Sequence, residues 1–160
     1  MKKLLAAAGL SLLAGCQIVT IGPDGNVVAE AQEPVTITPA TSGIGALLVA
    51  ERKAQGLGPM EESPLLSRVA EAHAKDMLAR GYFGHENPEG QSAWQRGTAA
   101  GYCSFVISEN LGAGDITQAG MVAEWMASSG HRKNILDPRF ARYGFARVED
   151  YWVLMLAAAC

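Results

Sequence analysis

The sequence predicts an α+β domain in which about four helices pack on a small antiparallel sheet. A helix is marked at both ends, by the side-chain cap and first-position proline of Ser63-Pro64 and by a closing Gly81. Near the C-terminus, two apolar runs are joined by the tight Glu149-Asp150 turn, which suits an antiparallel hairpin. The helix and strand patterns alternate irregularly, which favours α+β over the regular crossover units of a parallel sheet.

The composition is that of a folded chain that does not bind nucleic acid. Of the 160 residues, 49% are hydrophobic and 18% are charged, which favours a packed core over disorder and gives one domain plus a tail. The net charge is −3; loss of Lys2 and Lys3 with a leader leaves 11 basic and 16 acidic residues, a net charge of −5. Nucleic acid is excluded as the expected partner because its phosphates require cationic surfaces. Arg139, Arg142 and Arg147 are interpreted as a solvated strand face rather than a phosphate site.

The first 15 residues are predicted to be a lipoprotein signal peptide. A basic start precedes the apolar run Leu4 to Ala14, which is too short to span a bilayer. Leu13-Ala-Gly-Cys16 then resembles the bacterial lipobox, in which the cysteine thiol receives diacylglycerol. The alternative is an ordinary signal peptide with a chance cysteine.

Acylation of Cys16 predicts an exported protein that is anchored to a membrane and faces the periplasm or the exterior. Gln17 is not the aspartate that favours inner-membrane retention in enterobacteria, so the outer membrane is favoured. Residues 16–42 are rich in Pro, Gly, Thr and Val and are interpreted as a flexible tether. Runs 18–21 and 26–29 around Gly22-Pro-Asp-Gly25 also fit a small hairpin.

Residues 43–160 are predicted to form the folded domain. Glycine stop signals and the capping box at Ser92-Ala-Trp-Gln95 set most of the helix boundaries. Phe105-Val-Ile107 is interpreted as a buried strand, Asp115 to Gln118 as a helix cap, and Gly130 as the left-handed end of the helix that follows. The predicted elements are helices over 44–55, 64–80, 92–101 and 115–130, and strands over 105–107, 143–148 and 151–159.

Three histidines and two glutamates are the candidates for chemistry. His73 lies on the apolar face of its helix, which favours a core position. His85 and His131 each follow a predicted helix end, in loops where side chains serve a site or remain solvent-exposed bystanders. Glu109 ends a predicted buried strand and is desolvated unless it is paired. Glu124 lies opposite the apolar face of its helix and is interpreted as surface.

Three motifs carry a family resemblance. Gly81-Tyr-Phe-Gly-His85, then Ser108-Glu-Asn-Leu111, then Glu124-Trp-Met-Ala-Ser-Ser-Gly-His131-Arg-Lys-Asn-Ile-Leu136 occur in that order. Together they closely resemble the bacterial branch of the CAP superfamily, which includes cysteine-rich secretory proteins, antigen five and plant pathogenesis-related proteins. The resemblance covers about residues 43–160 and implies an α-β-α sandwich with a central antiparallel sheet.

The resemblance also implies a cleft. Family members generally line it with two histidines and two glutamates, and in some the histidines hold a divalent metal such as zinc. His85 and Glu109 match two of these positions; the second glutamate falls near Ser128, and the usual second histidine falls around 140–142, so the full set is not expected. His131 belongs to the bacterial signature. The predicted cleft residues are His85, Glu109, Ser128, His131 and Asn134, with His85 and His131 as the metal ligands.

The cysteines and the cleft lead to two functional hypotheses. With Cys16 acylated, Cys103 and Cys160 remain as an even pair and are predicted to form a disulfide; a reactive Cys103 with a histidine base is the alternative. The first functional hypothesis is a non-enzymatic binding or scaffold domain of the cell envelope for a small or extended ligand: a lipid, a peptide or a wall fragment. The second is a metal-dependent hydrolase of peptides or wall fragments with Glu109 as general base.

Overall fold

The computed structural model describes residues 20–21, 27–28 and 43–160. The predicted signal peptide, Cys16 and most of the predicted tether lie outside these residues. Strands β1 (Thr20–Ile21) and β2 (Val27–Val28) pair antiparallel, with Thr20 opposite Val28. This pairing agrees with the small hairpin that runs 18–21 and 26–29 also fit, beside the interpretation of the segment as a flexible tether.

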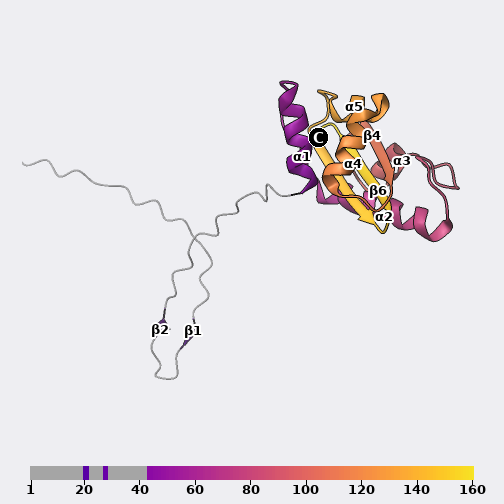
Figure 1. The fold of residues 1–160 in the computed structure, drawn as a ribbon. Helices are drawn as coiled ribbons and strands as arrows, with labels where there is room; N and C mark the ends of the chain where they lie inside the picture. The colour runs from indigo at the N-terminus through magenta and orange to yellow at the C-terminus, as the bar shows by residue number, and fades with distance from the viewer. Residues whose placement is uncertain (1–19, 22–26, 29–42) are drawn as a thin grey trace, which may run out of the picture. The chain divides into compact units, whose positions relative to one another are not determined.

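Residues 43–160 form a four-stranded sheet with helices on both faces (Figure 1). The strand order is β3-β5-β6-β4, with β3 parallel to β5 and the other pairs antiparallel. The α+β prediction is confirmed, although the two-residue strand β3 makes the sheet mixed. The helices are α1 (Ile44–Ala54), α2 (Pro64–Arg80), α3 (Ala93–Ala99), α4 (Gln118–Ala127) and α5 (Ser129–Ile135); the strands are β3 (Glu61–Glu62), β4 (Ile107–Ala113), β5 (Arg142–Val148) and β6 (Tyr151–Ala157).

Strand β6 is apolar along its whole length because it is buried on both faces. Alternate side chains of a strand point to opposite faces of the sheet. Trp152, Leu154 and Leu156 pack with α1, α4 and α5 in one core. Val153, Met155 and Ala157 pack with α2 and α3 in the other. These two cores define the α-β-α sandwich.

Local signals fix the helix that carries the site. The Ser63 hydroxyl accepts a hydrogen bond from the Leu66 amide, and Gly81 ends α2 with a φ of 68°. Gly144 of β5 lies directly against the backbone of Leu66 and Ser67, where a Cβ atom has no room. The first turn of α2 is thereby held against β5 of the sheet.

Several predicted boundaries differ from those of the structure. Phe105 does not lie in a buried strand: it is 73% exposed, and β4 begins at Ile107, because the opposite strand ends at Ala157. Glu109 is consequently the third residue of β4 rather than the residue that ends the strand. Gly130 does not end a helix, because an extended Ser128 interrupts the chain and α5 follows with Gly130 inside it.

Other details of the domain bear on the predictions. The cap of α4 is Thr117, whose hydroxyl accepts from the Gly120 amide, rather than Asp115. Cys103 and Cys160 form the predicted disulfide, with their Cα atoms 5.5 Å apart. No helix among the described residues is long and apolar enough to cross a bilayer. The three arginines predicted to lie on a solvated face pair with separate acidic residues: Arg139 with Asp137, Arg142 with Glu61, and Arg147 with Asp115.

Candidate functional site

The buried carboxylate of Glu109 is the centre of the candidate site. Its side chain is only 2% exposed. The Nδ1 atom of His85 lies 2.9 Å from Oε1, and a guanidinium N–H of Arg96 donates to Oε2 at 2.8 Å. Both oxygens are therefore engaged, as a buried charge requires.

His85 is the exposed member of this group. It lies in the segment after α2, and its side chain is 57% exposed. Its hydrogen bond to the Glu109 carboxylate raises the pKa of His85 above the ordinary value, because the charged imidazole gains a partner. With Nδ1 on Glu109, the opposite ring atom, Nε2, has no hydrogen bond to any residue that the structure describes.

His73 is the buried histidine beside this group. It is 1% exposed, which confirms its predicted core position. Its Nε2 atom lies 3.0 Å from the Gly84 carbonyl and 3.9 Å from Glu109 Oε1. A carbonyl can only accept, so Nε2 carries the proton. Burial lowers the pKa of His73, so the neutral form is favoured.

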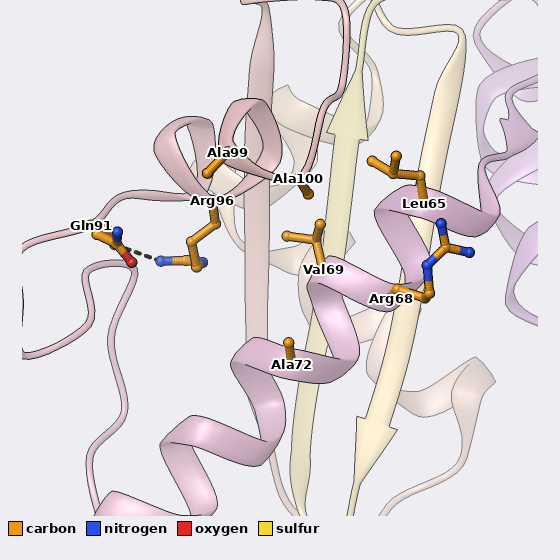
Figure 2. Close-up of a pocket in the computed structure, with 8 residues that line it drawn as sticks. All are labelled: Leu65, Arg68, Val69, Ala72, Gln91, Arg96, Ala99 and Ala100. Atoms are coloured by element: carbon orange, nitrogen blue, oxygen red, sulfur yellow. Dashed lines mark hydrogen bonds between the residues drawn. The ribbon is translucent and has the colours of Figure 1, made fainter.

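Arg96 links Glu109 to the backbone of the His85 segment. Its guanidinium donates to the carbonyls of His85 at 2.9 Å and Gln91 at 2.6 Å, and its side chain is 10% exposed. Its Nε atom is buried without a hydrogen-bond partner among the described residues. Arg96 also lines a groove of about 340 Å³ between α2 and α3, whose other walls are largely apolar (Figure 2). It thus separates this groove from Glu109.

The five predicted cleft residues lie around two cavities along β4. His85, Glu109 and Asn134 line the first, of about 330 Å³; its other lining residues are Ser92, Ala93, Trp94, Ile107 and Ser108. Ser128 and His131 line the second, of about 410 Å³, which follows β4 from Leu111 to Ala113. We call the first cavity the Glu109 cleft.

Helix α5 is fixed against β4 by amide hydrogen bonds. The Asn134 side chain donates to Asn110 Oδ1 at 2.9 Å, and the Asn110 side chain donates to the His131 carbonyl at 3.0 Å. His131 therefore lies on a helix rather than in the predicted loop. Burial lowers the pKa of its imidazole, and the charge of His85 lowers it further.

Sequence reasoning missed Arg96 and the contacts of His73. Arg96 lies in a seven-residue helix, 13 positions before its carboxylate partner, and no motif marks it. The capping box at Ser92 located the helix but gave no indication of what its last turn contacts. Glu124 was correctly predicted to be exposed.

The donors around the cleft do not form a ready metal centre. Among the residues that the structure describes, no three His, Cys, Asp or Glu side chains are placed to hold one ion. Glu109 is 2% exposed and already accepts hydrogen bonds from His85 and Arg96, two cationic or ionisable groups. The imidazoles of His85 and His131 remain as donors.

Comparison with known proteins identifies the family of the chain and its bacterial relatives. The model of the cysteine-rich secretory protein family, CAP, matches residues 47–155. The uncharacterized protein YkwD of Bacillus subtilis (strain 168) is 37% identical over 129 residues, which is 76% of this chain and 50% of that protein. The chain thus spans about half the length of this curated relative.

Solved structures show the same fold. An extracellular protein containing an SCP domain from Bacillus anthracis matches with a TM-score of 0.70 and 24% identity, over 72% of this chain and 39% of that one. An outer surface protein of Borrelia burgdorferi matches with a TM-score of 0.67 and 20% identity, over 72% of this chain and 90% of that one. At these identities the likeness establishes the architecture alone.

Proposed function

Because the chain belongs to the cysteine-rich secretory protein (CAP) family, in its bacterial branch, we propose that it is a membrane-anchored binding protein of the cell envelope. An acylated Cys16 would hold it on a membrane, with the outer membrane favoured, and the Glu109 cleft would take the ligand. One observation carries the binding role: a buried carboxylate fixes the ring of an exposed histidine at the wall of an open cavity.

The pairing of Glu109 with His85 suits ligand binding. A histidine whose one nitrogen is held by a carboxylate has a fixed ring orientation and a more basic second nitrogen. The Nε2 atom of His85 is then a directed group for a ligand hydroxyl, carbonyl or cation. Because Arg96 holds the other oxygen of Glu109, the carboxylate cannot turn away from the imidazole.

We propose a divalent metal only as an ion that the imidazoles of His85 and His131 bind reversibly. The charge of His85 lowers the pKa of His131, although the two imidazoles line different cavities. Two imidazoles with solvent fall short of the three protein ligands of catalytic zinc sites. We favour binding over a metal-dependent hydrolase, because Glu109, the general base that the hydrolase requires, is only 2% exposed and already accepts a hydrogen bond at each oxygen.

Zinc titration of the chelator-treated protein tests whether His85 of the Glu109 cleft and His131 of the second cavity bind one ion. We expect binding to be weaker below about pH 6.5, since an imidazole must be neutral to act as a ligand, and to be lost in the His85→Ala, His131→Ala double variant. The Glu71→Gln variant, changed at an exposed position of α2 outside both cavity linings, is the control and should bind as wild type does. Equal affinity in the wild type and the double variant would exclude the imidazole pair.

The anchor is tested separately. The intact mass of the mature protein should show a chain that begins at an acylated Cys16, and the protein should partition into detergent. The Cys16→Ser variant should enter the aqueous phase. A wild-type protein with an unmodified Cys16 that stays in the aqueous phase contradicts the anchor but leaves the cleft untouched.

A further inference from the structure

We infer that the Glu109 cleft is a saccharide-binding site, in which Trp94 and Phe105 form the surface that the sugar rings stack on. The inference rests on the proposed binding function and names its ligand class. The fold leaves these two aromatic side chains exposed beside a polar cavity.

The aromatic pair lies at the rim of the cleft. Trp94 lines the cavity and is 42% exposed. Phe105, which is 73% exposed, packs against it with ring centroids 6.5 Å apart and planes tilted by 47°. The other two tryptophans, Trp125 and Trp152, are each 1% exposed, so this fold buries its indoles elsewhere. Exposed apolar surface at a cavity commonly marks a ligand site.

The cavity wall supplies the polar half of a sugar site. A pyranose ring has apolar C–H faces and a perimeter of hydroxyls, so it needs an aromatic face and hydrogen-bonding groups side by side. The Ser108 hydroxyl and the His85 Nε2 atom line the cleft and have no hydrogen-bond partner among the described residues. Because Glu109 is balanced by Arg96 and His85, the cavity favours a neutral polyol over a strongly charged ligand.

The disulfide holds the aromatic rim in place. Phe105 follows Cys103 by two residues, and Cys103 is bonded to Cys160. On the same segment, the Tyr102 hydroxyl donates to the Ala158 carbonyl at 2.8 Å, and the Ala158 amide donates to the Val106 carbonyl at 3.0 Å. A rim ordered before binding loses less conformational entropy when the ligand arrives.

The free edge of β4 argues against an extended peptide as the ligand. A peptide strand that adds to a sheet needs unpaired backbone groups. The Leu111 carbonyl accepts from the Trp125 indole at 2.8 Å, and the Glu109 carbonyl accepts from Asn134 at 3.4 Å. Side chains therefore occupy the carbonyls that an added strand would use.

Calorimetric titration of the purified protein with the tetramer of β-1,4-linked N-acetylglucosamine tests the inference, with cellotetraose as a second neutral probe. We expect saturable binding of at least one of them, weakened about tenfold in Trp94→Ala, the scale of losing a well-formed aromatic contact, and largely restored in Trp94→Phe. Phe105→Ala should weaken it by a smaller factor. The control is Leu78→Ala, since Leu78 is equally exposed at 42% but lies on α2 away from the cleft lining.

Tryptophan fluorescence gives an independent readout. With Trp125 and Trp152 buried, acrylamide should quench chiefly Trp94, and saturating oligosaccharide should protect it. Reduction of the disulfide should weaken protection, because the segment that carries Phe105 is released.

The outcomes separate this inference from the proposed function. If neither oligosaccharide binds while zinc binding still depends on the imidazoles, the ligand class named here is wrong and the proposed binding function remains supported. Binding that is unchanged in Trp94→Ala overturns the stacking surface. Trp94-dependent binding to phosphatidylcholine vesicles, without binding to either sugar, would replace the saccharide with a lipid surface. Loss of both the zinc and the sugar results refutes the cleft itself.

Discussion

Glu109→Gln is the change that tests the site most directly. The substitution keeps the size of the side chain and removes its charge. Arg96, which is 10% exposed, then has no counter-ion, and one of the two groups on the carboxylate meets an amide N–H2 instead of an oxygen.

The size of the effect follows from burial. Removal of one partner of a buried ion pair costs about 3–5 kcal/mol of folding free energy. We expect about 3 kcal/mol, the low end, because Arg96 keeps its hydrogen bonds to the carbonyls of His85 and Gln91. This is a large fraction of the roughly 5–15 kcal/mol that stabilises a domain.

Urea unfolding of wild type, Glu109→Gln, Arg96→Met and the double variant measures the effect as a double-mutant cycle. The double variant should be less destabilised than the sum of the single ones. A coupling energy below about 0.5 kcal/mol, the usual limit of additivity for independent sites, would refute the assignment of a buried pair. Glu109→Gln should also lower the pKa of His85 toward its ordinary value, because the hydrogen bond to Glu109 is what raises that pKa. NMR titration of the three histidines measures this change.

The remaining predictions concern the stability of the domain. Reduction of Cys103–Cys160, which are 57 positions apart, should lower the free energy of unfolding by up to about 4 kcal/mol in the chain-entropy model, and an unchanged urea midpoint would contradict this. Arg52→Met should cost about 3 kcal/mol or more, because the buried guanidinium donates to four carbonyls; thermal unfolding measures it, and Lys53→Met at an exposed position is the control. His73, whose pKa is lowered by burial, contributes stability that is present above about pH 6.5 and is lost as the pH falls below that value, because the unfolded chain takes up the proton first. His73→Gln should therefore flatten the loss of stability between pH 7 and pH 5, and an unaltered slope would show that another group causes it. Gly144→Ala should destabilise the fold at any pH, since the new methyl group meets the backbone of α2; circular dichroism melting checks this.

The parts of the fold with strong local signals were predictable. Helix α2 begins and ends where Ser63-Pro64 and Gly81 indicate, and the β5–β6 hairpin turns at Glu149-Asp150. In both cases the residues that define the boundary are neighbours in the sequence. The chemistry of caps and turns acts over three or four residues, so a single sequence contains the information.

The boundaries that failed depend on distant partners. Phe105 and Val106 have the side chains of a buried strand, yet β6 ends opposite Ile107 and leaves them outside the sheet. Gly130 looks like a helix end, but its helix is a second one, because the chain bends at Ser128 to bring Asn134 against Asn110. The strand register and the tertiary contacts determine these two boundaries, and the local sequence pattern does not contain that information.

The candidate site shows the same division between local and distant information. His85 and Glu109 were identified from the resemblance and from a burial argument: a carboxylate on an apolar strand needs a partner. That argument predicts that a partner exists, but it does not identify Arg96 as one. Arg96 is the partner that the sequence did not reveal. Its helix is marked by a capping box, but its hydrogen bond to Glu109 on β4 is a tertiary contact. With Arg96 on one carboxylate oxygen and His85 on the other, Glu109 fixes the orientation of the His85 ring at the wall of the cleft.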